Sequence, residues 1–153
     1  LEDTDYEVTF RNGKIGFPSG VSSEGSPLPQ NVEALYKEDL SRTLCLAALN
    51  AFQNFFNGAH FDGTTNGESL SSYLNFLNTM KNGEDLSFMI NNQFDVSRIA
   101  ISNLDDNFIN QISTNNNLML IAFEELQANV VLLKSDMFSA LSIAVEFESG
   151  DGD

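Results

Sequence analysis

The sequence has little of the chemistry on which most enzymes depend. Its 153 residues include one cysteine, Cys45, one histidine, His60, and no tryptophan. A single cysteine excludes an internal disulfide, and Cys45 lies in the apolar run 44–49, as a buried small residue does. Zinc sites need three or four suitable ligands, and this chain offers no recognisable set. The sequence therefore predicts no catalytic residue, no metal site and no cofactor in this chain.

Basic residues are also few. There are 7 Lys and Arg against 22 Asp and Glu, and the formal net charge is −15. Such a chain repels a phosphate backbone and an anionic membrane surface, so nucleic acid is excluded as a partner. No apolar run reaches the roughly 18 residues of a membrane span, which predicts that there is no transmembrane segment. We interpret the acidic surplus as a solvated surface.

The first 30 residues predict a hairpin followed by an irregular connector. Residues 6–10 (YEVTF) alternate apolar with polar side chains, as does a strand with one buried face. The dipeptide Asn12-Gly13 follows, and it favours a tight turn between two strands. A second short run precedes a stretch rich in Ser, Gly and Pro. We therefore expect residues 1–30 to form a β-hairpin and an interdomain connector.

From residue 31 onward, apolar residues recur at helical spacing. One segment ends at Gly58, a shorter one begins at Ser69, and a third begins at Leu86. The last carries an apolar seam with spacings of 4, 3, 4, 3, 4 and 3 residues: Met119, Phe123, Leu126, Val130, Leu133, Met137 and Ala140. Four stripes with short connections predict a mainly α fold, with an antiparallel four-helix bundle over residues 31–153.

Two further segments bear on the ends of these helices. Asn82-Gly83 is interpreted as the break between the second and third helical segments. At the C-terminus, residues 143–147 (IAVEF) return to alternation, which is compatible with a short strand. That strand would pair with the N-terminal hairpin and bring the two ends of the chain together.

The order of several short motifs resembles the second half of imelysin-like proteins. Residues 12–20 (NGKIGFPSG) are similar to the family's GKIGIPLG segment, and residues 27–36 (PLPQNVEALY) to its P-x-x-V-E-x-x-Y. Three later motifs follow in the same order: AFQNFFNG at 51–58, NGESLSSYL at 66–74, and LSIAVEF with DGD at the end. They are similar to L-x-A-x-x-N-x-F-x-G, G-x-S-L-x-D-x-L and LGVSLTF with DGD. The correspondence covers nearly the whole chain.

The resemblance implies a helical domain that packs against a related N-terminal bundle of the same protein. It also implies an exported protein linked to iron or haem uptake, periplasmic or anchored at the cell surface through an upstream segment. The family's peptidase label rests on a G-x-H-x-x-E motif in the other half. Here His60 follows Gly58, but position 63 is Gly63 instead of Glu, so no catalytic residue carries over. The acidic residue expected after Ser-Leu is also replaced, by Ser71 or Ser72.

The segment that joins the two halves is the candidate for a binding role. Its glycines permit close backbone approach, and six of its residues are candidates for a cleft between the halves that takes a small ligand or a metal ion: Ile15, Gly16, Pro18, Gly20, Ser22 and Ser23. The expected function is a non-catalytic half of an imelysin-like protein. Two alternatives stay open: half of a metal-dependent peptidase whose motif lies in the N-terminal half, and an unrelated helical adaptor.

Overall fold

The structure is a computed structural model that describes residues 3–37 and 39–143. Most of this part of the chain is helical, and it contains one small antiparallel sheet. The elements follow in this order: η1 (Asp3–Gly16), α1 (Phe17–Ser19), η2 (Pro29–Asn31), α2 (Ser41–Asn57), α3 (Leu70–Phe76), β1 (Met80–Lys81), β2 (Glu84–Asp85), α4 (Leu86–Ser102), α5 (Phe108–Asn115), α6 (Asn117–Val131), η3 (Leu132–Met137) and α7 (Phe138–Ala140). The prediction of a mainly α fold is confirmed.

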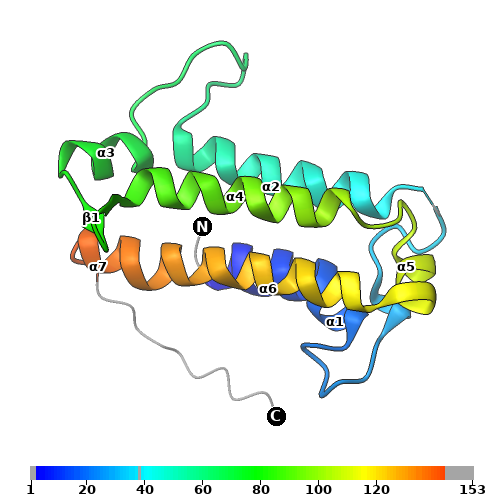
Figure 1. The fold of residues 1–153 in the computed structure, drawn as a ribbon. Coiled ribbons are helices and arrows are strands. Elements are labelled where there is room, and N and C mark those ends of the chain that lie inside the picture. Colours follow the sequence, from blue (N-terminus) through cyan, green and yellow to red (C-terminus); the bar gives the residue numbers. More distant parts are fainter. Residues whose placement is uncertain (1–2, 38, 144–153) are drawn as a thin grey trace.

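The long helices lie in two layers (Figure 1). In one layer α2 and α4 run side by side in opposite directions. In the other, η1 packs against α6, again in opposite directions. The layers meet because α4 packs on α6 and α2 packs on η1. The short helix α5 lies at one end of the molecule, and the sheet lies at the other.

The apolar seam of the last helix faces the core, as its spacing predicts. Five of its members are buried: Met119, Leu126, Val130, Leu133 and Met137. α6, η3 and α7 continue one another without a break, because the residues at both junctions keep right-handed helical angles. The result is one helical rod over residues 117–140, with its apolar stripe against α4 and η1.

The ends of the other helices follow from local chemistry. Gly58 ends α2 in the left-handed conformation, with a φ of 66°, which costs glycine little. Ser69 and Ser72 form a reciprocal capping box at the start of α3. The side chains of Asp85 and Asn107 accept backbone N–H groups at the starts of α4 and α5. The helix end at Gly58 and the start at Ser69 agree with the sequence prediction, whereas the side-chain caps at Asp85 and Asn107 were not predicted.

The N-terminal hairpin prediction is wrong, because residues 3–16 form the helix η1. Tyr6 and Phe10 are 2% and 1% exposed, whereas Val8 between them is 50% exposed. A strand with one buried face would place all three on the same side. Positions 6 and 10 are also four residues apart, so a helical turn fits them equally well. The buried set of Tyr6, Phe10, Arg11 and Ile15 has steps of four and five, which suit the wide turns of a π-helix.

The hairpin of this protein forms instead at the second Asn-Gly dipeptide. β1 and β2 pair antiparallel, with Met80 opposite Asp85 and Lys81 opposite Glu84. The turn residues Asn82 and Gly83 have φ values of 54° and 86°, as a type I′ turn requires. Gly13 is not among the residues of positive φ. The dipeptide that the sequence pattern marked only as a helix break therefore forms the β-turn.

The N-terminal helix shares the core of the later helices. Tyr6, Phe10 and Ile15 are part of one buried cluster with residues of α2, α4 and α6. The division of the chain at residue 30 stays a prediction. The C-terminal strand predicted over 143–147 lies outside the described residues, apart from Ile143. None of the helices in the described ranges combines the length and apolar character that a bilayer crossing requires.

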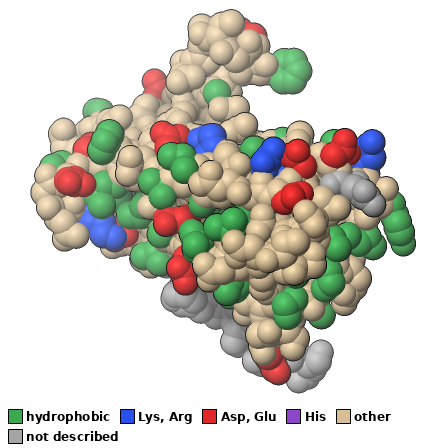
Figure 2. Space-filling model, turned by 45° about the vertical axis from the view of Figure 1, so that its right-hand side comes forward, with side chains coloured by type: hydrophobic (Ala, Val, Ile, Leu, Met, Phe, Trp, Pro, Cys, Tyr) green, Lys and Arg blue, Asp and Glu red, His purple; other side chains and the backbone are tan. Residues whose placement is uncertain are grey.

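All seven basic residues form ion pairs, so the acidic surplus remains as surface charge. The pairs involve Arg11, Lys14, Lys37, Arg42, Lys81, Arg98 and Lys134. Figure 2 shows basic side chains beside acidic ones, with apolar side chains between them. Most of these pairs are partly exposed, and such pairs contribute little to stability. Their consequence is electrostatic: each of these seven cationic side chains has a carboxylate beside it.

Two phenylalanines on α4 test the assignment of the core. Phe94 is fully buried, and Phe88 is 65% exposed. Phe94→Ala should lower the free energy of unfolding by about 3–5 kcal/mol, because it leaves a cavity. Phe88→Ala should change it by less than about 0.5 kcal/mol. Urea unfolding followed by circular dichroism measures both, and similar losses for the two variants would contradict this packing.

Candidate functional site

The candidate segment 15–23 forms a compact turn at the end of η1. Gly20 caps α1 with a φ of 97°, and its N–H donates to the carbonyl of Gly16 at 3.1 Å. The N–H of Ser22 donates to the same carbonyl, also at 3.1 Å. The side chain of Ser23 donates to the carbonyl of Ser26 at 2.6 Å. These bonds hold the six candidate residues in one short stretch of folded backbone.

This segment packs on the beginning of α6. A Cβ on Gly16 would lie 2.9 Å from Cε2 of Phe123 and closer still to Oγ of Ser22, so a larger residue would force these side chains to shift. The side chain of Asn116 donates to the carbonyl of Ser19 at 2.8 Å. Of the six candidates, Ile15, Gly16, Pro18 and Gly20 are buried in the chain's own fold. Ser22 and Ser23 are half-buried, and the hydroxyl group of each donates a hydrogen bond within the chain.

Arg11 connects the segment to the interior, and the sequence did not mark it as a site residue. The side chain is 6% exposed and lies 4.8 Å over the ring of Phe123. Its guanidinium donates to Glu7 Oε1 at 3.0 Å and to Asn12 Oδ1. Asn12 Oδ1 also accepts from the hydroxyl of Ser22 at 3.0 Å. Glu7 and Arg11 are four residues apart, and their ion pair depends on the helical conformation of η1. The strand predicted for residues 6–10 therefore gave no indication of it.

An apolar groove lies on another side of η1, where this helix meets α2. It has a volume of about 490 Å³ and a wall of apolar side chains: Phe10, Ala48, Ala51, Phe52 and Phe55. Asp5, Thr9 and Lys14 complete its lining. Asp5 and Phe55 also line a second hollow of about 310 Å³, which extends to Leu70 and to Phe138, Leu141 and Ile143. The two hollows therefore share Asp5 and Phe55 in their linings.

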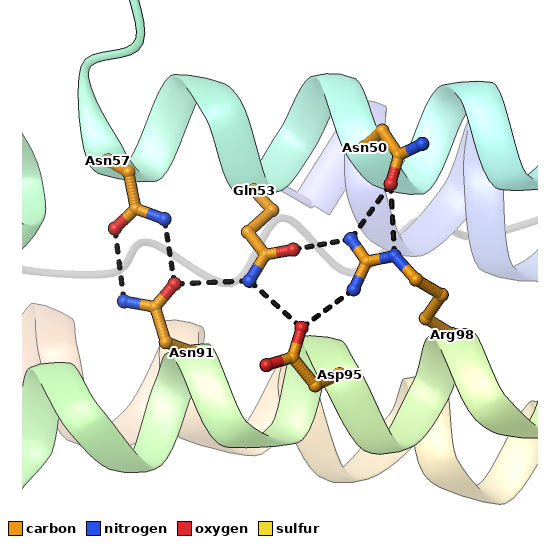
Figure 3. A network of polar contacts seen from close by, with 6 residues as sticks. All are labelled: Asn50, Gln53, Asn57, Asn91, Asp95 and Arg98. Carbon is orange, nitrogen blue, oxygen red and sulfur yellow. Dashed lines mark hydrogen bonds and ion pairs between the residues drawn. The ribbon is translucent and has the colours of Figure 1, made fainter. Parts of the chain in front are cut away.

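The outer edge between α2 and α4 is polar (Figure 3). The side-chain amides of Asn57 and Asn91 exchange hydrogen bonds of 2.7 and 3.0 Å. Gln53 donates to both Asn91 and Asp95. Arg98 donates to Asp95 on its own helix and to the amides of Asn50 and Gln53 on α2. This ladder of side chains aligns the two helices and leaves few polar groups there for a partner.

Outside this segment and the groove, the described side chains with catalytic or metal-binding potential do not gather in one site. His60 lies exposed in the loop after α2, where its backbone N–H donates to the carbonyl of Thr65 at 2.9 Å. Asp62 accepts the N–H of Thr64 in the same loop, and that bond lowers the pKa of its carboxyl. Cys45 is fully buried, and burial raises the pKa of its thiol to about 12. In the described part of the chain, no group of three His, Cys, Asp or Glu residues is placed to hold a metal ion.

The chain was also compared with known proteins. It matches no family model, no curated protein and no solved structure.

Two glycines of η1 test the packing of the candidate segment. Gly16→Ala should lower the free energy of unfolding by about 1–3 kcal/mol, because the new methyl meets Phe123 and Ser22. At Gly13 the nearest atom to a Cβ lies 3.6 Å away, so Gly13→Ala should be neutral or stabilising by up to about 1 kcal/mol. Chemical denaturation compares the two. Equal stability would mean that the segment does not pack on α6.

Cys45 should be inert in the folded protein. Its raised pKa keeps the thiol protonated at pH 8, and the protonated form is a poor nucleophile. A chromogenic disulfide reagent should therefore leave the native protein unlabelled over hours and react with one thiol per chain in urea. Rapid labelling without denaturant would contradict the burial of this side chain.

Proposed function

We propose that this chain is the non-catalytic half of an exported imelysin-like protein that takes part in iron or haem uptake. In this proposal the long helices act as an antiparallel four-helix bundle. The bundle packs against an N-terminal bundle of the same protein and forms one wall of a cleft for a small ligand or metal ion. Five sequence motifs in the family's order support the assignment, and so do the alternating directions of the long helices.

The apolar groove along η1 and α2 is the observation that carries the proposal. It is built from aromatic and aliphatic side chains, and Phe55 on its wall is 64% exposed. Contiguous apolar surface of this kind marks interaction sites in soluble proteins. The polar ladder between α2 and α4 is already hydrogen-bonded, so that edge does not need a partner. The groove is therefore the surface that a second helical bundle would cover.

The candidate segment would have a supporting part in this arrangement. Gly16 lets the turn lie close to Phe123 of α6, and Gly20 lets the loop residues 25–27 approach its own backbone. Ser22 and Ser23 would lie at the edge of the cleft, with their hydroxyl groups hydrogen-bonded within the chain. The metal ligands of any peptidase activity would have to come from the other half. Peptide cleavage by the intact protein that is lost on chelation would favour the alternative function, a metal-dependent peptidase.

Phe55→Glu tests the docking surface. The substitution places a charge in the groove and should weaken association with the N-terminal bundle at least tenfold. Stability of the chain itself should hardly change, because the side chain is 64% exposed in the folded state. The chain and the rest of its gene product are expressed as separate polypeptides, and calorimetry measures their affinity.

The matched control is Phe88→Glu on α4. Phe88 is 65% exposed, as Phe55 is, but it does not line the groove. This variant should bind like the unmodified chain. Equal weakening by both substitutions, or a gene product without a second helical bundle, would contradict the proposal.

A further inference from the structure

Four asparagines of the chain are followed directly by glycine: Asn12, Asn57, Asn66 and Asn82. An asparagine in this context can cyclise, because the backbone nitrogen of the next residue reaches the side-chain carbonyl carbon and closes a five-membered ring. Glycine favours the reaction, since it places no Cβ beside the attacking nitrogen. The reaction needs an N–H group that is free to lose its proton and an amide side chain that is free to turn. The structure separates the four positions by these two requirements.

Both groups are held at Asn12. Gly13 lies within η1, and in the interior of a π-helix each backbone N–H donates to the carbonyl five residues earlier. The side-chain oxygen of Asn12 accepts from Nε of Arg11 at 3.1 Å and from the hydroxyl of Ser22 at 3.0 Å. Cyclisation at this position would therefore disrupt the helix and these side-chain bonds.

Both groups are also held at Asn57. The N–H of Gly58 donates to the carbonyl of Phe55 at 3.1 Å, where the chain leaves α2. The side-chain amide of Asn57 exchanges hydrogen bonds of 2.7 and 3.0 Å with the amide of Asn91 on α4. The attacking nitrogen and the attacked carbon are therefore each fixed by a partner.

At Asn66 the attacking nitrogen is held. The N–H of Gly67 donates to the carbonyl of Gly58 at 2.8 Å. Asn66 itself forms a β-bridge with Ala59, which fixes the backbone on both sides of this peptide group. The side chain of Asn66 is exposed, but its neighbour's N–H must first give up a short hydrogen bond.

Asn82 is the position at which neither group is held. Asn82 and Gly83 form the turn between β1 and β2, at one end of the molecule (Figure 1). The ladder of this hairpin joins the flanking residues Lys81 and Glu84, and no described residue accepts the N–H of Gly83. Asn82 is exposed, and its side chain makes no hydrogen bond to a described residue. A Cβ on Gly83 would meet nothing within 4 Å, so the attacking nitrogen lies in open surroundings.

We propose that Asn82 is a site of spontaneous deamidation. The nitrogen of Gly83 loses its proton to the solvent and attacks Cγ of Asn82. A bond forms between this nitrogen and Cγ, and the bond from Cγ to Nδ2 breaks. Nδ2 takes up a proton from the solvent and leaves as ammonia. One water molecule then opens the cyclic imide: attack on Cγ gives aspartate, and attack on the main-chain carbonyl carbon gives isoaspartate.

The product changes the charge and the geometry of the hairpin. It adds a carboxylate one residue from Lys81, whose ammonium group pairs with Asp136 of η3. Asn82, Lys81 and Asp136 line the same hollow, which has a volume of about 440 Å³, so the modification adds a negative charge to its wall. Isoaspartate also inserts a methylene into the main chain, which a two-residue type I′ turn does not accommodate.

Peptide mapping of the folded chain tests the site. The chain is incubated in mildly alkaline buffer at physiological temperature, and samples are digested and analysed by mass spectrometry over time. Deamidation at Asn82 should be at least about tenfold faster than at Asn12, Asn57 and Asn66, because each of those three must first lose hydrogen bonds. In urea the four rates should become similar. Equal rates in the folded chain, or a faster rate at Asn66, would overturn the proposal.

The products and two variants test the cyclic step. Isoaspartate should form beside aspartate at position 82, and aspartate alone would mean direct hydrolysis and overturn this step. Asn82→Gln should abolish the modification at this position, because the longer side chain no longer closes a five-membered ring. The control is Asn78→Gln, at an exposed asparagine of positive φ that precedes Thr79, and it should leave the rate at Asn82 unchanged.

Discussion

The packing of η1 against the other long helices is the contact on which the other features depend. The ring of Tyr6 lies 5.0 Å from that of Phe52 on α2 and 6.0 Å from that of Phe94 on α4, so one side chain joins three helices. Edge-to-face aromatic pairs at these separations are favourable beyond the area they bury. With η1 fixed in this way, Phe10 lines the apolar groove and Arg11 is directed into the interior.

Burial of the polar side chains of Arg11 and Asn129 lowers the free energy of unfolding, so the stability of the fold alone does not explain their interior position. A buried charge without full compensation destabilises a fold, and apolar residues of similar size would serve the core better. Glu7 and the ring of Phe123 offset part of that cost.

The helix α2 divides its surface between two kinds of contact. Asn50, Gln53 and Asn57 form the polar ladder with α4, and their hydrogen bonds are made within the chain. Ala48, Ala51 and Phe55 line the groove instead. An edge that is saturated with hydrogen bonds gains little from a partner, whereas exposed aromatic and aliphatic surface gains from being covered. The two sides of α2 thus separate a structural face from an interaction face.

The sequence by itself determined the helices that carry strong local signals. The apolar seam of residues 119–140, the helix start at Leu86 and the helix end at Gly58 follow from periodicity and capping, which are local. Only the tertiary structure decided the conformations of the two Asn-Gly dipeptides. The dipeptide at 82–83 forms a turn, whereas the same two residue types at 12–13 lie within a helix. The groove likewise joins residues distant in sequence. Its position depends on how whole helices pack, and no local pattern encodes that.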